Sequence, residues 1–271
     1  MDIGVLIGLA VAVLAVLGAN AIDGGSLATL LNPSAALLIL GGTLGTTLVS
    51  SRLEDVIGLP KVVMDLIRPP RRDLAADVER LVELAQKARR SGLLALEEDI
   101  AKLDDPFLAR GLQMVVDGAD ADAVRGVLRT EMALQTQTVG RRATVLETAG
   151  GFAPTMGIIG TVMGLIHVLA NLANVSKLGP SIATAFLATF YGISTANVFW
   201  LPLANKLRLN AKASALAYEV ALEGVLSIQA GDNPSAVRDK LTVFLQGSAA
   251  ARNQGDTAPD TAAAKSGDQV A

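Results

Sequence analysis

Four long stretches of the chain contain no charged residue. The runs free of Asp, Glu, Lys and Arg are residues 3–22, 24–51, 149–176 and 178–205. Because about 20 helical residues cross roughly 30 Å of hydrocarbon, each run can hold one membrane-spanning helix. A cleaved signal peptide is the alternative for the first run, but Met1-Asp2 lacks the basic segment that such peptides carry.

Between the second and third runs, the chain has the pattern of soluble amphipathic helices. In DLAADVERLVELAQKARRSG, residues 73–92, apolar positions recur at three- and four-residue steps opposite charged ones. Asp73 is expected to cap this helix and Gly92 to end it. Two shorter helical segments follow, and a long helix from about residue 120 is predicted to continue into the third span.

These patterns predict an all-α fold, a polytopic membrane protein with four transmembrane helices and a helical cytoplasmic domain. The expected segments are a hairpin at 1–51 (spans about 3–22 and 30–50), a cytoplasmic domain at 52–148, a second hairpin at 149–205 (spans about 149–173 and 179–203), C-terminal cytoplasmic helices at 206–246 and a tail at 247–271. The tail is small, polar and without apolar periodicity, so we expect disorder.

Positive charge is distributed asymmetrically. Of the 23 Lys and Arg residues, fifteen lie between Ser51 and Thr148, seven follow Asn205, and Lys177 is the remaining one. By the positive-inside rule, the central segment and the C-terminus are cytoplasmic, as is the N-terminus, and both hairpin tips face outward.

Several kinds of chemistry are excluded or disfavoured by composition. The sequence has no cysteine, and its single histidine, His167, cannot form a multi-histidine metal site. It contains no convincing nucleophile–base pair and no glycine-rich phosphate loop after a strand. We therefore expect neither an enzyme nor a nucleic-acid-binding protein, and no cofactor.

Small residues recur at helical spacing in the last two runs. Gly160 and Gly164 form a GxxxG pair that continues from Gly157, and Ala188 and Gly192 have the same spacing in the fourth run. Lipid tails give helices little hydrophobic reason to adhere, so close packing through small residues supplies much of their association. We predict helix packing at the three glycines and at Gly192.

Proline and threonine residues interrupt the same apolar runs. Pro154 and Thr161 are seven residues apart, nearly two turns, so they lie on one side of the third span. Proline frees a backbone carbonyl about one turn earlier, which in a bilayer needs another partner or a wet cavity. Thr189 adds a hydroxyl in the fourth span. Two interpretations stay open: a kink with threonines bonded to their own helix, or polar groups lining an ion pathway.

The spans also lack any permanently charged residue. A helix bundle that moves ions usually needs an ionisable group at membrane depth. Either the chain conducts nothing, or a companion polypeptide supplies the titratable residue. His167 lies toward the outer end of its span, where an interfacial hydrogen-bonded histidine is favoured over a proton relay.

Four motifs resemble one known family, the MotA/PomA A subunit of the bacterial flagellar stator. They are APTMGIIGTVMGLIHVLANL (153–172), LGPSIATAFLATFYGISTANVFWLPLANKL (178–207), ARRSGLLALEEDI and DPFLARGLQMVVDG. The resemblance covers about residues 1–244 in order and includes the arrangement of two spans plus two. Only the C-terminal tail lies outside it.

The resemblance implies an assembly and a task. Five copies would surround two copies of a B subunit, whose single transmembrane helix carries the ion-accepting aspartate, in the bacterial inner membrane at the flagellar basal body. Ion passage would turn the ring against the rotor switch protein FliG. Pro154 and Pro202 match the prolines that couple ion flow to movement. The expected rotor-contact residues are Arg89, Arg90, Glu97 and Glu98.

The coupling ion is predicted from hydroxyl ligands. Sodium-using members resemble this chain at Thr161 and Thr189, whereas Ala188 stands where the sodium pattern commonly has another threonine. Because dehydrated Na⁺ needs oxygen ligands, Na⁺ is slightly favoured over H⁺. Two alternatives stay open: an ExbB/TolQ-type energiser of an outer-membrane system, which normally has three spans, and a non-conducting membrane scaffold.

Overall fold

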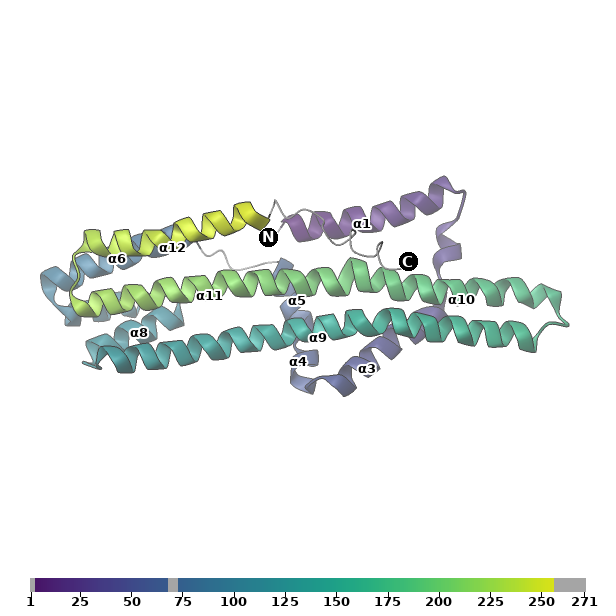
Figure 1. Cartoon of the computed structure of the whole chain (residues 1–271), viewed down its shortest axis with the longest axis horizontal. Coiled ribbons are helices and arrows are strands. Elements are labelled where there is room, and N and C mark those ends of the chain that lie inside the picture. The colour runs from purple at the N-terminus through teal and green to yellow at the C-terminus, as the bar shows by residue number, and fades with distance from the viewer. Residues whose placement is uncertain (1–2, 68–72, 256–271) are drawn as a thin grey trace, which may run out of the picture. The chain divides into compact units, whose positions relative to one another are not determined.

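The computed structural model describes residues 3–67 and 73–255, and this part of the chain is helical, without strands. It divides into two compact units. Unit 1 comprises Met1–Arg71 and Leu134–Ala213, and unit 2 comprises Arg72–Ala133 and Ser214–Ala271. The two longest helices, α9 (Ala121–Ala170) and α11 (Leu201–Ala230), contribute residues to both units (Figure 1).

Unit 1 carries the membrane-spanning helices. Within the described residues, four helical stretches are long and apolar enough to cross a membrane: Ile3–Ile22, Leu27–Ser50, part of Ala121–Ala170 and part of Leu178–Ala230. Their helices are α1 (Ile3–Ile22), α2 (Pro33–Ala36), α3 (Gly42–Ser50), α9 and α10 (Val175–Thr195), followed by the first part of α11. The predicted all-α membrane fold is confirmed.

The two hairpin tips differ in how well the sequence located them. The first turn lies where expected, after Ile22, and Gly24 adopts a φ of 76° there. The second turn was expected near 174–179, but α9 ends at Ala170 and α10 already begins at Val175. The Asn174 N–H donates to the Asn171 carbonyl at 2.9 Å and closes the turn within four residues. Pro180 therefore lies inside α10 as its sixth residue, where it leaves the carbonyl one turn earlier without an N–H partner from position 180.

Two spans are interrupted by π-helical turns. One covers Leu37–Gly41, between α2 and α3, and the other covers Ala196–Trp200, between α10 and α11. In the second turn the Leu201 N–H donates to the carbonyl of Ala196, five residues earlier. Pro202 has no N–H to continue a regular ladder, which accounts for the irregularity at this position.

The segment after the second span belongs to unit 1, which differs from the predicted domain boundary at 52. Two short helices, α4 (Leu53–Ile57) and α5 (Leu59–Ile67), follow α3. Leu59, Val62 and Leu66 are buried in one hydrophobic cluster with residues of α9 and α11, among them Leu146 and Leu203. This packing assigns 52–67 to unit 1, and the second unit begins later in the chain.

Unit 2 is a helical bundle with its own hydrophobic core. Its helices are α6 (Leu74–Ser91), a 3₁₀ turn (Leu93–Leu96), α7 (Glu97–Ile100), α8 (Pro106–Val116), the start of α9, the end of α11 and α12 (Pro234–Gly255). The core includes Leu81, Leu96, Phe107, Leu112, Leu128, Val225 and Leu241, all 1% exposed or less.

The ends of the unit 2 helices largely follow the sequence. Asp73 accepts hydrogen bonds from the N–H groups of Ala75 and Ala76, at 3.0 and 3.4 Å, and Asp105 caps α8 from Phe107 N–H at 2.9 Å. α12 continues to Gly255, nine residues beyond the predicted boundary at 246, through a run of alanines with high helix propensity. The rest of the predicted tail lies outside the described residues.

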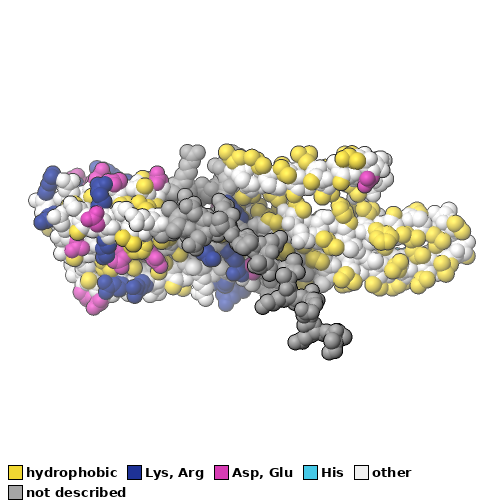
Figure 2. All heavy atoms as spheres, turned by 45° about the horizontal axis from the view of Figure 1, so that its top comes forward, with side chains coloured by type: hydrophobic (Ala, Val, Ile, Leu, Met, Phe, Trp, Pro, Cys, Tyr) yellow, Lys and Arg dark blue, Asp and Glu magenta, His cyan; other side chains and the backbone are white. Residues whose placement is uncertain are grey.

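The surfaces of the two units differ in character. Figure 2 shows hydrophobic side chains over the spans, whereas Lys, Arg, Asp and Glu gather on the other helices. Large apolar residues of the spans are widely exposed, including Leu14, Leu37, Val49, Leu169 and Phe186. A hydrocarbon environment or further helices must cover such a surface.

Candidate functional site

Helices α9 and α10 meet along a seam of small residues. A Cβ atom placed on Gly160 would lie 2.4 Å from the Cβ of Ala188, and one placed on Gly164 would lie 2.5 Å from the Cβ of Ala185. On Gly157 it would lie 3.1 Å from the Thr189 Cα. The three glycines therefore let the backbones of the two helices approach closely, which fits the packing predicted for them.

The closest approach to a backbone atom along this seam is made by Gly192. A Cβ atom there would lie 2.5 Å from the carbonyl oxygen of Ala153 and 3.2 Å from the Gly157 Cα. Both neighbours are backbone atoms, so no side chain can move aside to make room. Any side chain at position 192 would push the two helices apart.

Two threonine hydroxyls meet across the seam. Thr161 in α9 and Thr189 in α10 are hydrogen-bonded to each other through their Oγ1 atoms. Thr161 also contacts the carbonyls of Gly157 (3.1 Å) and Ala185 (3.2 Å), and Thr189 lies 3.5 Å from the Gly157 carbonyl. Thr161 thus bonds its own helix, as the first interpretation expects, and the two hydroxyls also converge across the seam, whereas the ion pathway stays a prediction.

Pro154 and Ala188 have different places near this oxygen cluster: Pro154 is half-buried in α9, and Ala188 is buried in the seam. Pro154 is inside α9, half-buried, and the seven-residue spacing puts it on the same side of the helix as Thr161. Ala188 is 1% exposed, and its side chain contacts the position of Gly160. The structure therefore places Ala188 in the packing seam, where a larger residue would be crowded.

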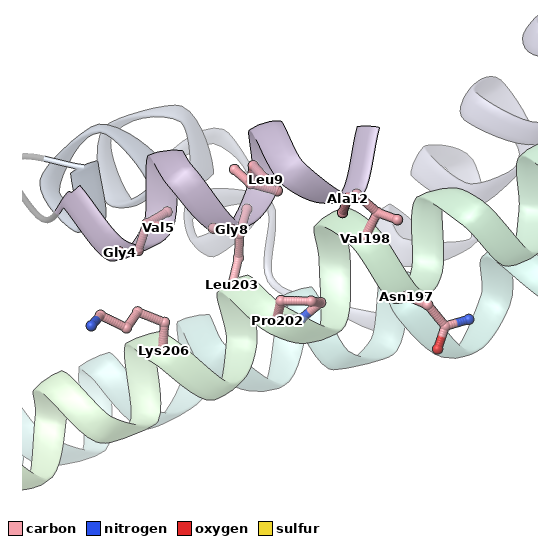
Figure 3. A pocket seen from close by; sticks show the side chains of 10 residues that line it. All are labelled: Gly4, Val5, Gly8, Leu9, Ala12, Asn197, Val198, Pro202, Leu203 and Lys206. Carbon is pink, nitrogen blue, oxygen red and sulfur yellow. The ribbon is translucent and has the colours of Figure 1, made fainter. Parts of the chain in front are cut away.

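Pro202 lies at a cavity between the first and last spans. This cavity has a volume of about 400 Å³ and is lined by Gly4, Gly8 and Ala12 of α1 and by Pro202 and Leu203 of α11. Figure 3 shows α1 running beside the α11 segment that carries these two residues. No atom of the described residues lies within 4 Å of a Cβ placed on Gly8, so α1 leaves space beside Pro202.

A polar connection at the start of the second span was not predicted. The Tyr191 hydroxyl donates to the Leu30 carbonyl and accepts the Asn32 N–H at 3.0 Å. The Asn32 Nδ2 donates to the Thr184 Oγ1 at 2.9 Å, while its Oδ1 caps α2 through the Ala35 N–H. These bonds join the second span to α10. Nothing in the local sequence indicates them, because the partners are about 150 residues apart.

Threonines of the second span were also overlooked. Thr43 and Thr47 are 1% and 0% exposed, and the Thr47 hydroxyl donates to the Thr43 carbonyl at 2.7 Å. The Thr43 hydroxyl is buried without a hydrogen-bond partner among the described residues. A period of four in the hydroxyl residues of GTLGTTLVS was the available signal for a polar side of this helix.

The four charged residues predicted for rotor contact lie in unit 2 on either side of Gly92. Arg89 and Arg90 are in the last turn of α6, and Glu97 and Glu98 are in the first turn of α7. All four are exposed, and none forms an ion pair with another described residue. The neighbouring Lys87–Asp99 pair, at 2.6 Å, connects the two helices and leaves the four charges available to a partner.

The structure thus brings the predicted residues together in two groups. The threonines, Pro154 and the glycine seam share unit 1, and the charged residues share unit 2. Within the part of the chain that is described, no group of three His, Cys, Asp or Glu residues could hold a metal ion.

Comparison with known proteins gives matches over most of the chain. A model described as motility protein A N-terminal matches residues 6–92, and the MotA/TolQ/ExbB proton channel family matches residues 99–220. Motility protein A of Bacillus subtilis (strain 168) is 36% identical over 249 residues, covering 90% of this chain and 91% of that protein. Chemotaxis protein PomA of Vibrio alginolyticus is 32% identical, with coverage of 90% and 97%.

Solved structures agree with these relatives. The flagellar MotAB stator complex from Bacillus subtilis contains a chain that is 35% identical to this one, with a TM-score of 0.83, and the match covers 94% of this chain and 98% of that chain. The similarity includes both units and nearly the whole length. The four spans, the glycine seam and the two domain matches lead to one conclusion: the chain belongs to the MotA/PomA family of flagellar stator A subunits, within the MotA/TolQ/ExbB proton channel family.

Proposed function

We propose that this chain, together with a B subunit, forms an ion channel that converts ion-motive force into torque for swimming motility. The observation that carries this proposal is the contact between the Thr161 and Thr189 hydroxyls, in a pair of spans without any acid. Such a cluster supplies oxygen ligands for a cation but no group that can accept a proton.

The missing carboxylate supports a B subunit as partner. The described spans contain no Asp, Glu, Lys or Arg at membrane depth, whereas ion transport through a bundle usually requires an ionisable group there. A single helix carrying an aspartate, inserted in a ring of these chains, would bring the acid to the threonine pair. A ring of five copies around two B subunits is the stoichiometry that we propose, in line with the family.

The direction of the chain in the membrane follows from its charges. We propose that both termini and unit 2 are cytoplasmic, because fifteen Lys and Arg residues lie between the hairpins and seven follow the last span. This orientation in the bacterial inner membrane places the exposed Arg89, Arg90, Glu97 and Glu98 on the side of the rotor. Charges of both signs would then steer FliG, in a manner sensitive to salt.

We propose Na⁺ as the coupling ion, narrowly preferred over H⁺. At the seam, the Thr161 hydroxyl lies within 3.2 Å of the carbonyls of Gly157 and Ala185. The Thr189 hydroxyl contacts the Thr161 hydroxyl and lies 3.5 Å from the Gly157 carbonyl. Oxygen ligands of this kind replace the hydration shell of a metal cation, whereas a proton needs only a titratable relay. The packed position of Ala188 leaves no room for a further threonine hydroxyl at that position.

Substitution of Thr161 tests the ion pathway. In cells that also express the B subunit, Thr161→Ala should change the dependence of swimming speed on Na⁺ concentration and on pH, because one hydroxyl ligand is lost. Thr161→Ser keeps the hydroxyl and is the matched control. We expect wild-type ion dependence for the serine variant and an intact complex for both. Identical speeds of the alanine variant and wild type under all Na⁺ and pH conditions would remove the hydroxyl from the pathway.

Pro154 and Pro202 are proposed to couple ion passage to movement. Pro154 lies inside the continuous helix α9, one turn after Gly150, and Pro202 follows the π-turn of the last span beside a cavity. Both sites combine a missing backbone hydrogen bond with neighbouring space or small residues, so helix bending there requires little repacking.

A further inference from the structure

A second polar pocket lies at the end of the spans that carries the charged residues. Its volume is about 470 Å³, and its wall includes Ser50, Arg52, Asp55, Arg141 and Arg208. All of its lining residues belong to unit 1. The pocket differs from the threonine pair because three of its side chains are guanidinium groups.

The charges of this pocket are only partly balanced. Asp55, 8% exposed, accepts from the Arg141 Nε at 3.4 Å. Arg208 donates to Glu147 at 2.6 Å, and Glu147 is not itself part of the wall. Within the described residues, Arg52 has no ion-pair partner. The wall thus holds three guanidinium groups and one carboxylate, and Arg141 and Arg208 keep further N–H donors beyond these two bonds.

The position of the pocket relative to the membrane can be inferred from the ends of the apolar stretches. Ser50 is the last residue of the apolar stretch Leu27–Ser50, and Arg52 follows two residues later. On α9, the lining residue Thr148 comes directly before the charge-free run that begins at 149, and Thr144 lies one turn earlier. The pocket is therefore level with the boundary between hydrocarbon and water, where the phosphates of lipid headgroups lie.

We propose that this pocket binds the phosphate of an anionic phospholipid. Arginine is suited to phosphate because its planar fork of N–H donors matches two phosphate oxygens at once. Asp55 and Glu147 hold Arg141 and Arg208 in place, and Arg52 supplies the charge that lacks a counterion. The hydroxyls of Ser50 and Thr144 can donate to the remaining oxygens. This proposal does not depend on the coupling ion or on torque generation.

Native mass spectrometry of the purified complex with its B subunit tests the proposal. The complex is released from nanodiscs of phosphatidylglycerol and phosphatidylcholine mixed in equal amounts, and the retained lipids are identified. We expect retained phosphatidylglycerol on the wild type. Arg52→Gln should lower its retention about tenfold, the effect of losing one charge-assisted contact. Lys61→Gln, which removes an exposed charge of α5 outside the pocket, should retain lipid as wild type does.

Three outcomes would overturn the proposal. Equal loss in Lys61→Gln and Arg52→Gln would mean general electrostatic attraction instead of a site. Displacement of the lipid by millimolar inorganic phosphate, with no preference for phosphatidylglycerol, would identify a free-phosphate site. Failure of Arg52→Gln to assemble in pure phosphatidylcholine, with wild type assembling normally, would show that Arg52 acts in assembly without an anionic lipid.

Discussion

At the scale of single residues, the close packing of α9 against α10 depends on glycines, which have no side chain at the contact. At Gly157, Gly160, Gly164 and Gly192, a methyl group would crowd the facing helix. The spacing of these glycines allowed the packing to be predicted from the sequence. The hydrogen bonds of Asn32 with Tyr191 and Thr184 could not be predicted from residue spacing. They depend on which two distant helices meet, and no periodicity within one helix records that.

Gly192 provides the sharpest test at this scale. Gly192→Ala would place a methyl group 2.5 Å from the Ala153 carbonyl, so we expect a loss of about 1–3 kcal/mol in stability from overpacking. Thermal unfolding of the detergent-solubilised complex measures it. Gly126→Ala in α9 is the control, because no described atom lies within 4 Å of its Cβ position, and it should be neutral or slightly stabilising. A Gly192 variant as stable as wild type would mean that the helices are not held this close.

At the scale of elements, helix ends were easier to predict than irregularities within helices. The Asp73 cap, the Gly92 stop and the start of α8 after Asp105 all follow from local side-chain chemistry. The π-turns at Leu37–Gly41 and Ala196–Trp200 were not expected. The second can be related to Pro202, whereas the first contains no proline, so the same local signal could not have located it.

The connection between α6 and α7 depends on Gly92. Its φ of 84° and ψ of 165° lie in a region that is open almost only to glycine, so Gly92→Ala should cost about 1–3 kcal/mol. We expect a lower denaturation midpoint in urea, followed by circular dichroism, and weaker motility because the two charged helix ends are displaced. Ser91→Ala is a suitable neighbour control, since Ser91 is helical and exposed. An unchanged midpoint for Gly92→Ala would show that the turn relaxes without strain.

The charged ends of the same two elements give a separate prediction. Reversal of Arg89 and Glu97 together, as Arg89→Glu with Glu97→Arg, keeps the net charge but inverts its pattern. We expect motility to be lost while ion conductance through the complex stays at the wild-type level, because both residues lie in unit 2 and are exposed. Swimming assays and ion-flux measurements on the same strain separate the two. A fall in conductance as well would assign these residues to something other than rotor contact.

At the scale of the whole molecule, composition and patterning predicted most of the architecture. The all-α membrane fold and the MotA/PomA family are both confirmed. The division into units was predicted less well, because residues 52–67 look soluble in sequence yet pack with the spans through Leu59, Val62 and Leu66. Amphipathic periodicity shows that a helix has a buried side but does not identify the surface that covers it.

The missing acid makes a prediction for the whole assembly. The chain reconstituted alone in liposomes should carry no cation current, whereas the complex with the B subunit should, because in the proposed mechanism the acid at membrane depth comes from the partner. Ion-flux assays with Na⁺ and H⁺ gradients measure both preparations. A complex whose B-subunit aspartate is changed to alanine is the control and should behave like the chain alone. A current through the isolated chain would refute the need for a borrowed carboxylate.

The π-turn at Ala196–Trp200 has a consequence for insertions and deletions in this family. Such a turn accommodates one extra residue in a helix that otherwise follows the regular repeat. Deleting one residue there would therefore give a regular helix whose downstream residues keep nearly the same phase. The same deletion within the regular part of α11 would rotate everything that follows by about 100° about the helix axis and turn its buried side away, so the π-turn is the position in the last span that best tolerates the loss of one residue.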